Sequence, residues 1–334
     1  MELSEAEIQV LASLEKAGIE DGPTDRPSLE ANADRFWIFR EDWSEAYSSL
    51  VAKGLLEGNE AGYRLTQAGR PLAERYHHQR PDMYWYYYQK FYQAARPSAA
   101  HSELCKRAFG EDLCQEGQTD MASLEELLDI LDLKRGEHIL DLGCGAGVIA
   151  EYISDRKGVS VTGLDYADPA IDEANQRTAD KRSRLTFLHG DMNALDLPAR
   201  SLDAVISIDT LYWVSDLEET LSKLVAALRP GGRMGIFMNQ HIAEGEDPAE
   251  LAPERTELSK ALSRLGVPFK TSDYTVRIGE FWQRTWQAAT DLQTEFEAEG
   301  NGFITASLIR ESEEEYLPDV KAGRISRYLY HVRV

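Results

Sequence analysis

The sequence predicts an α/β protein in which a doubly wound parallel sheet follows a smaller N-terminal unit. The first observation is size: 334 residues exceed one typical domain, and 43% apolar residues can fill the cores of two. The second is the pattern from residue 138 onward, where apolar runs of strand length alternate with helical stretches. The third is a turn with three alternate glycines directly after the first of these runs.

Residues 1–80 are predicted to form the N-terminal unit. The stretch "SEAYSSLVAKGLLEGNEAGYRLTQAGRPLAERY" predicts a helix, two short strands around a Gly/Asn turn, and a further helix. A helix that ends in "KGLL", followed by a wing that ends in "YRLT", resembles a winged-helix domain. In many regulators such a domain binds DNA.

Charge argues against nucleic acid as the main partner. The formal net charge is −22, whereas phosphate backbones require a basic surface, although a salty or alkaline habitat would also favour an acidic excess. The candidate recognition helix near residues 40–54 is itself more acidic than basic. Three aromatic residues in this region offer area for protein contact instead: Trp37, Phe39 and Trp43.

Residues 81–135 are predicted to be an aromatic-rich helical connector. One short run contains Tyr84, Trp85, Tyr86, Tyr87, Tyr88, Phe91 and Tyr92. Helical spacing allows these rings to form a core, or some of them to line a pocket whose ring faces attract an ammonium group.

The motif "HILDLGCGAGVIAEYIS", which begins at His138, predicts a strand, a turn that requires bare backbone, and a helix. A dinucleotide site has the pattern GxGxxG, but Val148 stands where the third glycine is needed. No GK[ST] sequence follows a glycine-rich loop, so a phosphate-binding P-loop is excluded. The glycines at this turn are Gly143, Gly145 and Gly147.

Acidic residues end the next two apolar runs. Asp165 ends the second predicted strand, where a carboxylate can accept hydrogen bonds from two ribose hydroxyls. The third predicted strand ends in "GDM", where Asp191 can bind an adenine amino group and Met192 can pack on the ring. The stretch "LRPGGRMGIF" then leads from a helix through a tight turn into the fifth predicted strand.

Five segments, in order, are "ILDLGCGAG", "VTGLDYAD", "HGDMNALDLP", "LDAVISIDTLYWV" and "LRPGGRMGIF". Together they resemble the successive motifs of class I S-adenosylmethionine-dependent methyltransferases, over about residues 120–240. The resemblance implies a seven-stranded Rossmann-like sheet in residues 136–334, with C-terminal specificity elements. It also implies S-adenosyl-L-methionine as the cofactor.

The resemblance assigns candidate cofactor-binding residues. It places Asp141 and Gly143 near the methionine moiety, Asp165 at the ribose, and Asp191 and Met192 at the adenine. The segment before the leading helix of the domain resembles the cofactor-covering segment of small-molecule N-methyltransferases of the glycine, sarcosine and dimethylglycine type. The remaining candidates are Gly145, Gly147, Tyr166, Asp209 and, from the covering segment, Gln115.

Three residues are candidates for catalysis: Asp209, Tyr212 and His241. Asp209 and Tyr212 follow the fourth predicted strand, at the sheet edge where ligands bind, although Tyr212 could equally serve helix packing. His241 follows the fifth predicted strand and could act as a general base, or could be an exposed loop histidine. Candidate specificity elements nearer the C-terminus are Trp282, Arg284 and Trp286, and Arg324 or Arg327 could hold a substrate carboxylate or pair with surface acids.

The sequence therefore predicts a methyltransferase that acts on a small-molecule N or O acceptor. A macromolecule (RNA or protein) methyltransferase and a winged-helix regulator with a methyltransferase-like sensor domain are the alternatives. We predict a cytoplasmic protein with no membrane contact, because no apolar run has the length of a span or a signal peptide. No metal is predicted, because the Cys and His residues lack ligand spacing. In many resembling enzymes a winged-helix-like unit joins two protomers, which implies a homodimer.

Overall fold

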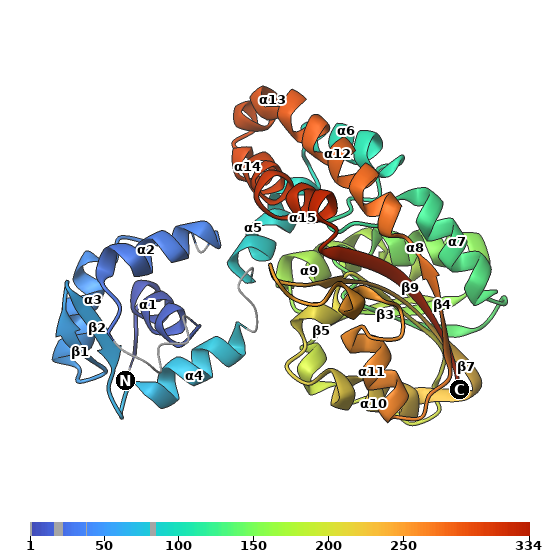
Figure 1. The fold of residues 1–334 in the computed structure, drawn as a ribbon, viewed down its shortest axis with the longest axis horizontal. Helices are drawn as coiled ribbons and strands as arrows, with labels where there is room; N and C mark the ends of the chain where they lie inside the picture. Colours follow the sequence, from blue (N-terminus) through green and yellow to red (C-terminus); the bar gives the residue numbers. More distant parts are fainter. Residues whose placement is uncertain (1, 17–22, 38, 81–84) are drawn as a thin grey trace. The chain divides into compact units, whose positions relative to one another are not determined.

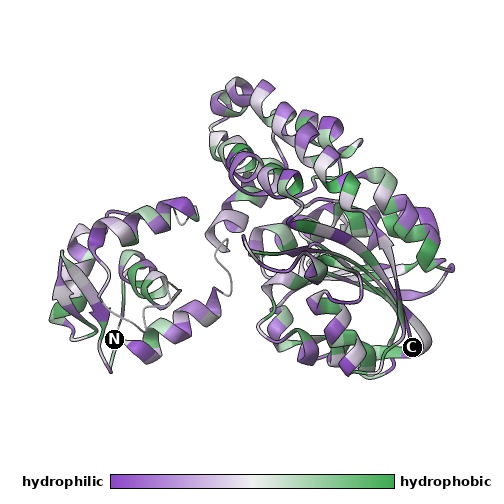
Figure 2. Cartoon of the chain, in the orientation of Figure 1, coloured by the Kyte–Doolittle hydropathy of each residue, from purple (hydrophilic) through white to green (hydrophobic). Residues whose placement is uncertain are grey.

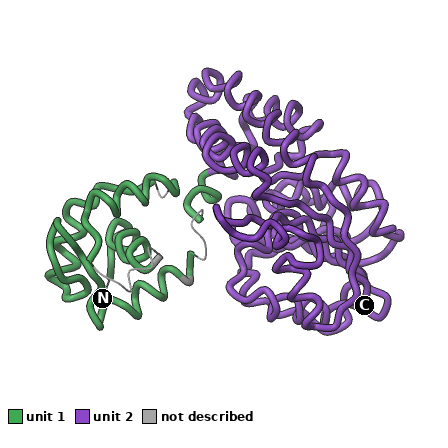
Figure 3. The backbone as a smooth tube through the Cα atoms, viewed as in Figure 1, with its two compact units in different colours: residues 1–90 green, residues 91–334 purple. Residues whose placement is uncertain are grey.

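The computed structural model describes residues 2–16, 23–37, 39–80 and 85–334 (Figure 1). The chain divides into two compact units, Met1–Lys90 and Phe91–Val334 (Figure 3). The division falls within helix α5 (Trp85–Ala95), inside the segment expected to be a connector. Each unit is described by itself below.

The first unit contains helices and one β-hairpin. The predicted helix, pair of strands and further helix are all present, and the hairpin turns between Asn59 and Gly62. An isolated bridge from Thr24 to Tyr63 adds a third extended segment beside the hairpin. The elements are α1 (Glu5–Lys16), α2 (Arg26–Arg35), α3 (Ser44–Ala52), β1 (Leu56–Asn59), β2 (Gly62–Leu65) and α4 (Arg70–Gln79).

Trp43 anchors the core of the first unit. Its side chain is fully buried, and its indole N–H donates to Oε1 of Gln9 at 2.9 Å. Tyr47, on the next turn of α3, stacks on Tyr63 of the hairpin with ring centroids 4.7 Å apart. The expectation that Trp43 offers surface for a protein partner is therefore wrong, because this ring fills the core of its own unit.

The second unit is built on a seven-stranded sheet with the order β5-β4-β3-β6-β7-β9-β8 (Figure 1). Neighbouring strands from β5 through β7 are parallel, and β9 is antiparallel to both of its neighbours. The strands are β3 (His138–Leu142), β4 (Ser160–Asp165), β5 (Leu185–His189), β6 (Leu202–Ile208), β7 (Leu228–His241), β8 (Phe269–Asp273) and β9 (Ile325–Arg333).

The five apolar runs predicted as strands correspond to β3–β7, and the final predicted strand is β9. The predicted seven-stranded α/β sheet is confirmed: β3–β7 form its parallel part, and the antiparallel β9 makes the sheet mixed. Strand β8 was not predicted from the sequence. This edge strand, "FKTSD", is mostly polar and exposed, and it lacks an apolar run.

Helices cover both faces of the sheet. On β3, Ile139 belongs to the core formed with one set of helices, whereas Leu140 and Leu142 belong to the core on the other face. This alternation follows from the two-residue period of a strand, and apolar residues line the helix faces toward the sheet (Figure 2). On one face lie α7 (Met121–Leu131), α8 (Val148–Lys157) and α9 (Asp168–Arg177), and on the other α10 (Leu217–Ala227) and α11 (Glu257–Arg264).

A group of helices, called here the cap helices, is inserted between β8 and β9 at residues 275–322. The longest cap helix packs against α6 (Ala99–Phe109), and the rings of Phe109 and Phe281 meet at 5.1 Å. None of the helices in the described residues is long and apolar enough to span a membrane. The cap contains α12 (Thr275–Asp291), α13 (Gln293–Ala298), α14 (Gly302–Glu311), a π-helical turn (Ser312–Tyr316) and α15 (Leu317–Ala322).

The buried indole predicts a stability effect confined to the first unit. Trp43→Ala should lower the free energy of unfolding by about 3–5 kcal/mol, because it leaves a cavity and removes the hydrogen bond from the indole to Gln9. Urea unfolding followed by far-UV circular dichroism measures the change. Val51→Ala, at an exposed position of the same helix, is the control and should stay within about 0.5 kcal/mol of the parent. Equal effects of the two substitutions would contradict the assignment of Trp43 to the core.

Candidate functional site

The turn between β3 and α8 is made of residues 143–147. Its three alternate glycines have φ angles of 76°, 52° and 68°, in the left-handed region that side chains disfavour. Gly147 is the N-cap residue of α8, so the positive end of that helix faces the turn. The turn therefore presents backbone, and not side chains, at the carboxyl edge of the sheet.

Close packing also excludes side chains from these positions. A Cβ atom at Gly143 or Gly145 would overlap a side chain from another element, and the same holds at Gly147. The three spaces are occupied by Thr210, Tyr92 and Phe187, respectively. The glycines thus allow three separate elements to approach the backbone of the turn.

A pocket lies against this turn. Its cavity volume is about 50 Å³, and it is partly open to solvent. One wall is the glycine turn and the strand before it, and the other wall is the segment from Leu113 to Glu116 that precedes α7. The pocket brings together four of the residues predicted to bind the cofactor: Gln115, Asp141, Gly143 and Gly145.

Asp141 is the charged group of the pocket floor. Its side chain is only 4% exposed, and it accepts no hydrogen bond from any residue that the structure describes. Burial, with a smaller contribution from the Asp165 carboxylate, raises the pKa of Asp141 to about 7. A cation in the pocket would stabilise the ionised form of this carboxylate.

Asp165 ends β4 and fixes the shape of the turn. Its carboxylate accepts hydrogen bonds from the backbone N–H of Gly145 at 2.8 Å and of Ala167 at 2.9 Å. Burial raises the pKa of Asp165, although these backbone donors act in the opposite direction. The neighbouring Tyr166 is half-buried, and its carbonyl oxygen lies 2.9 Å from Nε2 of His189.

Asp191 and Met192 follow β5, the next strand along the same edge. Asp191 is half-buried and accepts hydrogen bonds from the backbone and side-chain nitrogens of Asn193. Met192 is buried and belongs to the sheet core that contains Leu140 and Leu142. Neither residue lines the pocket beside the glycine turn.

Asp209 has a positive φ of 58° and a side chain that is 4% exposed. Both carboxylate oxygens accept hydrogen bonds from Arg327, at 2.5 and 2.9 Å, and one also accepts from the backbone N–H of Gln118 at 2.9 Å. Tyr212 lies 3.3 Å from the same carboxylate, and its hydroxyl accepts from the backbone N–H of Asn239. The structure therefore gives both predicted catalytic residues, Asp209 and Tyr212, partners within the protein.

His241 ends β7 and is exposed. Its Nδ1 lies 3.0 Å from Oδ2 of Asp319, a residue of the cap, and its ring contacts Tyr316 at 5.6 Å between centroids. Asp319 also accepts a hydrogen bond from Arg324. Within the described residues, no group of three or more His, Cys, Asp and Glu side chains is arranged to hold a metal ion.

The remaining candidates are spread over the cap and the connector. Trp282 is buried and stacks on Tyr316 at 3.9 Å, whereas the other two cap candidates make ion-pair or hydrogen-bond contacts with acids. Among the aromatic residues of the connector, Tyr87 and Phe91 are core, and Tyr92 lines the pocket. Tyr84 lies outside the described residues.

Several residues of the site were not predicted from the sequence. Gln118 and Asn239 bind each other across the sheet edge at 2.6 Å, and Asn239 also accepts from the buried guanidinium of Arg327. Arg327, expected to hold a substrate carboxylate or to pair with surface acids, instead pairs with Asp209 in the interior. No local pattern marks these residues, because their partners are far away in the chain.

The sheet order and the glycine turn define the fold of class I methyltransferases. Residues 139–232 match the sequence model of a family described as "Methyltransferase domain". Residues 139–232 are therefore similar to a methyltransferase domain, and the second unit has the fold of class I methyltransferases.

Curated relatives share this domain. The chain is 32% identical over 149 residues to 27-O-demethylrifamycin SV methyltransferase of Amycolatopsis mediterranei, covering 41% of this chain and 54% of that protein. It is 29% identical over 129 residues to phosphoethanolamine N-methyltransferase 3 of Arabidopsis thaliana, covering 39% and 26%. The chain thus spans about half, or less, of the length of these relatives.

A solved structure extends the likeness of the fold. Phosphoethanolamine N-methyltransferase 2 of Haemonchus contortus, in complex with phosphomonomethylethanolamine and S-adenosylhomocysteine, superposes with a TM-score of 0.59 at 18% identity. The match covers 74% of this chain and 60% of that one. At this identity the likeness concerns the fold.

The unpartnered carboxylate predicts a pH-dependent stability. The raised pKa means that the folded protein prefers the neutral form of Asp141, so this contribution to stability is present near pH 4 and lost as the pH rises through 7. Asp141→Asn should therefore raise the free energy of unfolding at pH 8 by about 1–3 kcal/mol, with a gain that shrinks toward pH 4.

Urea unfolding of the ligand-free protein at both pH values measures this difference. Asp196→Asn, at an exposed position, is the control and should change stability equally little at either pH. If Asp141→Asn does not raise the free energy of unfolding at pH 8, Asp141 is not a buried carboxylate without partners.

Proposed function

We propose that this chain is an S-adenosylmethionine-dependent methyltransferase that transfers a methyl group to a small-molecule N or O acceptor. The observation that carries the proposal is the buried, unpartnered Asp141 in a pocket made by the glycine turn of a methyltransferase domain. A cationic ligand compensates such a carboxylate, whereas a pyrophosphate would be repelled by it.

The residues present fit this cofactor. The glycine turn is a cradle that a Cβ atom would fill, and Asp141 faces the pocket without a partner. Asp165 accepts from the backbone N–H groups of Gly145 and Ala167, with Tyr166 as a further backbone donor, and the roughly four acceptor sites of a carboxylate leave one for a ribose hydroxyl. We propose that the cofactor is held by Gly143, Gly145, Gly147, Asp141, Asp165, Tyr166, Asp191, Met192 and Gln115.

When bound, the sulfonium supplies an activated methyl group, so the protein mainly aligns the acceptor and excludes water. Apolar side chains on both walls support the exclusion of water: Leu113, Ile149 and Ile208. The backbone of the turn and the segment before α7 orient the cofactor.

His241 is the proposed general base for an acceptor that arrives protonated. Asp319 holds Nδ1 at 3.0 Å, which leaves Nε2 to take a proton. Tyr212 is a poor candidate, since burial raises the pKa of its hydroxyl far above the usual value and the oxygen already accepts a hydrogen bond. We therefore propose that Tyr212 and Asp209 support the structure of the site and that His241 is the general base.

A small acceptor is favoured over a macromolecule. The net charge of −22 opposes nucleic-acid binding, and the named relatives act on rifamycin or phosphoethanolamine derivatives. These two acceptors are an oxygen and a nitrogen, so the choice between O- and N-methylation stays open to experiment. Methylation of RNA or protein, or a regulator with a sensor domain, is the competing function.

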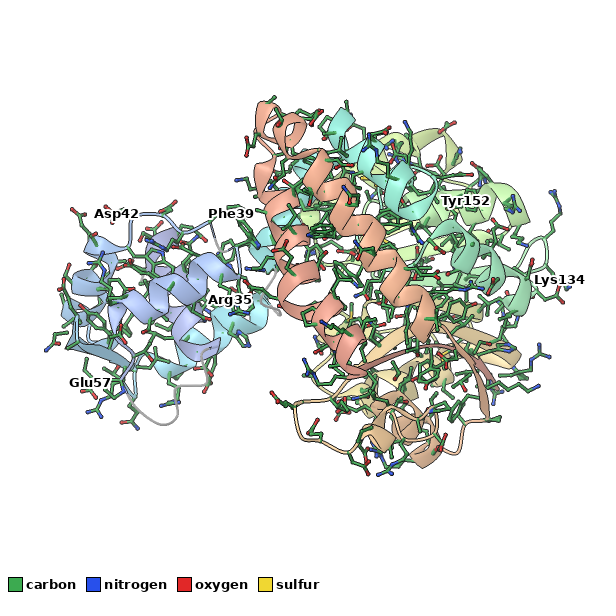
Figure 4. All side chains as sticks on the ribbon, turned by 45° about the horizontal axis from the view of Figure 1, so that its top comes forward. Arg35, Phe39, Asp42, Glu57, Lys134 and Tyr152 are labelled. Atoms are coloured by element: carbon green, nitrogen blue, oxygen red, sulfur yellow. The ribbon has the colours of Figure 1, made fainter. Side chains whose placement is uncertain are left out.

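We propose that the first unit is winged-helix-like and joins two protomers or covers the active site. Three helices followed by a hairpin, with the bridge from Thr24 to Tyr63, support this topology. Near α3 the basic side chains are already paired: Arg40 binds Asp34, and Lys53 binds Glu7. Acidic side chains such as those of Asp42 and Glu57 are exposed (Figure 4), which opposes contact with phosphates.

Cofactor binding tests the proposed function. Calorimetry should detect binding of S-adenosylmethionine and its demethylated product, and no binding of NAD. Because Asp141 must lose its proton to meet a cation, affinity for S-adenosylmethionine should be about ten-fold weaker at pH 6 than at pH 8. Asp141→Asn should weaken binding at pH 8 and flatten this pH dependence.

Tight binding of NAD with no response to S-adenosylmethionine would disprove the proposed cofactor. A screen of metabolite extracts for transfer of a labelled methyl group then identifies the acceptor. Label that appears only in RNA or protein would favour the competing function. Loss of turnover in a chelator, restored by a divalent ion, would overturn the prediction that no metal is needed.

The role of the first unit is tested by mass and by DNA binding. Light scattering should give the mass of two chains for the full-length protein and of one chain for a protein that starts at residue 80. A gel-shift assay at low salt should show no complex with duplex DNA. A monomeric full-length protein that binds DNA with a steep salt dependence would contradict the proposal and favour the regulator.

A further inference from the structure

The segment from residue 113 to 119 forms one wall of the pocket and is fastened at its far end. Its first part, including Gln115, lines the pocket opposite the glycine turn. Its last part is bound to Asp209: the backbone N–H of Gln118 donates at 2.9 Å, and the hydroxyl of Thr119 donates at 3.3 Å. We call residues 113–119 the wall segment. Its position depends on where Asp209 is held.

Arg327 holds Asp209. The guanidinium donates to both carboxylate oxygens and also to Oγ1 of Thr119 at 2.7 Å. It donates to Oδ1 of Asn239 at 2.7 Å as well, and its charge lies over the ring of Phe237 at 5.0 Å. Arg327 is 2% exposed, so these contacts are made without competition from water. The planar fork of an arginine suits such bidentate pairing.

The side chain of Gln118 adds a second fastening. Its Nε2 donates to the hydroxyl of Tyr316 in the cap at 2.7 Å, and its Oε1 accepts from Asn239 at 2.6 Å. One residue of the wall segment is therefore bound to the cap, to β7 and, through its backbone, to the end of β6. The ion pair between Arg327 and Asp209 takes part in two of these connections, through Asn239 of β7 and through the backbone of Gln118.

Asp209 itself is held in an unfavourable conformation. Its φ of 58° is in the left-handed region, and Gly117 of the wall segment lies close to its carboxylate. Such strain persists only where surrounding contacts enforce it, and it often occurs at functional sites. At Asp209 the backbone N–H donates to the carbonyl oxygen of Phe237, and Arg327 binds the carboxylate.

We propose that Arg327 is a positioning residue: its ion pair with Asp209 holds the wall segment against the cofactor pocket and so sets the affinity for the cofactor. This inference rests on the proposed function and extends it to a residue that does not line the pocket. Direct contact of Asp209 with a ligand is disfavoured, because each of its oxygens already accepts from Arg327 and from a second donor, Tyr212 or Gln118.

Arg233 provides a matched control. It is also a buried arginine of the sheet, 8% exposed, and it pairs with Glu137 and the carbonyl oxygen of Asp132. It lies six residues before Asn239 on β7, or about 20 Å away at 3.3 Å per residue. Loss of either arginine removes a buried ion pair, but only Arg327 contacts the wall segment.

The experiment compares Thr119→Val, Arg327→Met, Arg327→Lys and Arg233→Met with the parent protein. Calorimetry measures the dissociation constant of S-adenosylmethionine, urea unfolding measures stability, and hydrogen exchange reports the Gln118 amide in the ligand-free protein. Thr119→Val is the most informative variant. It removes only the side-chain hydroxyl through which the wall segment contacts both Asp209 and Arg327, and it leaves the ion pair itself in place.

We expect Arg327→Met and Thr119→Val to weaken cofactor binding by roughly ten-fold or more, the effect of losing groups that support a site. Both should accelerate exchange of the Gln118 amide, and Arg327→Lys should recover part of each effect. Arg233→Met should lose stability, while its affinity stays within about two-fold of the parent and exchange at Gln118 is unchanged.

Unchanged affinity and unchanged Gln118 exchange in Thr119→Val would overturn the proposal, even where Arg327→Met does not fold. Equal loss of affinity in Arg233→Met and Arg327→Met would also overturn it, because the effect would then follow stability alone. If the parent protein fails to bind S-adenosylmethionine, the proposed function fails, and the exchange of Gln118 still decides whether Arg327 holds the wall segment.

Discussion

The bare backbone between β3 and α8 is the constraint on which the rest of the site depends. Side chains from α5, β5 and the end of β6 occupy the spaces that Cβ atoms would need: Tyr92, Phe187 and Thr210. The hydrogen bond from Gly145 to Asp165 then ties the turn to the end of β4. Four elements thus converge on one short loop, and any side chain there would force at least one of them away.

This convergence also explains the electrostatics of the site. Asp141 and Asp165 are both buried near the turn. The charge of Asp165 raises the pKa of Asp141, and both carboxylates raise the pKa of the Cys144 thiol. Backbone donors compensate Asp165, but nothing in the described chain compensates Asp141. An isolated buried carboxylate is destabilising, so its presence is best explained by a ligand that supplies the missing positive charge.

Much of the second unit could be predicted because its signals are local. Apolar runs gave the positions of β3–β7, and strand ends gave the acidic residues at the sheet edge. The edge strand β8 carries no apolar run, and no local pattern marks the antiparallel direction of β9, which follows a long helical insertion. In the first unit, Trp43 is buried in the core. An aromatic residue suits a core as well as a protein contact surface, so its type alone did not predict its position.

The limits of local signals are clearest at the sheet edge. A carboxylate that ends a strand is correctly expected near the site, yet the function of Asp209 is decided by Arg327, 118 positions further along the chain. The same reasoning applies to the acceptor. The chain is similar both to a 27-O-demethylrifamycin SV methyltransferase and to a phosphoethanolamine N-methyltransferase, so this similarity does not identify the acceptor. That information must lie in segments that contact the edge from outside the shared motifs. In this chain the cap helices do so through Tyr316 and Asp319, which reach Gln118 and His241.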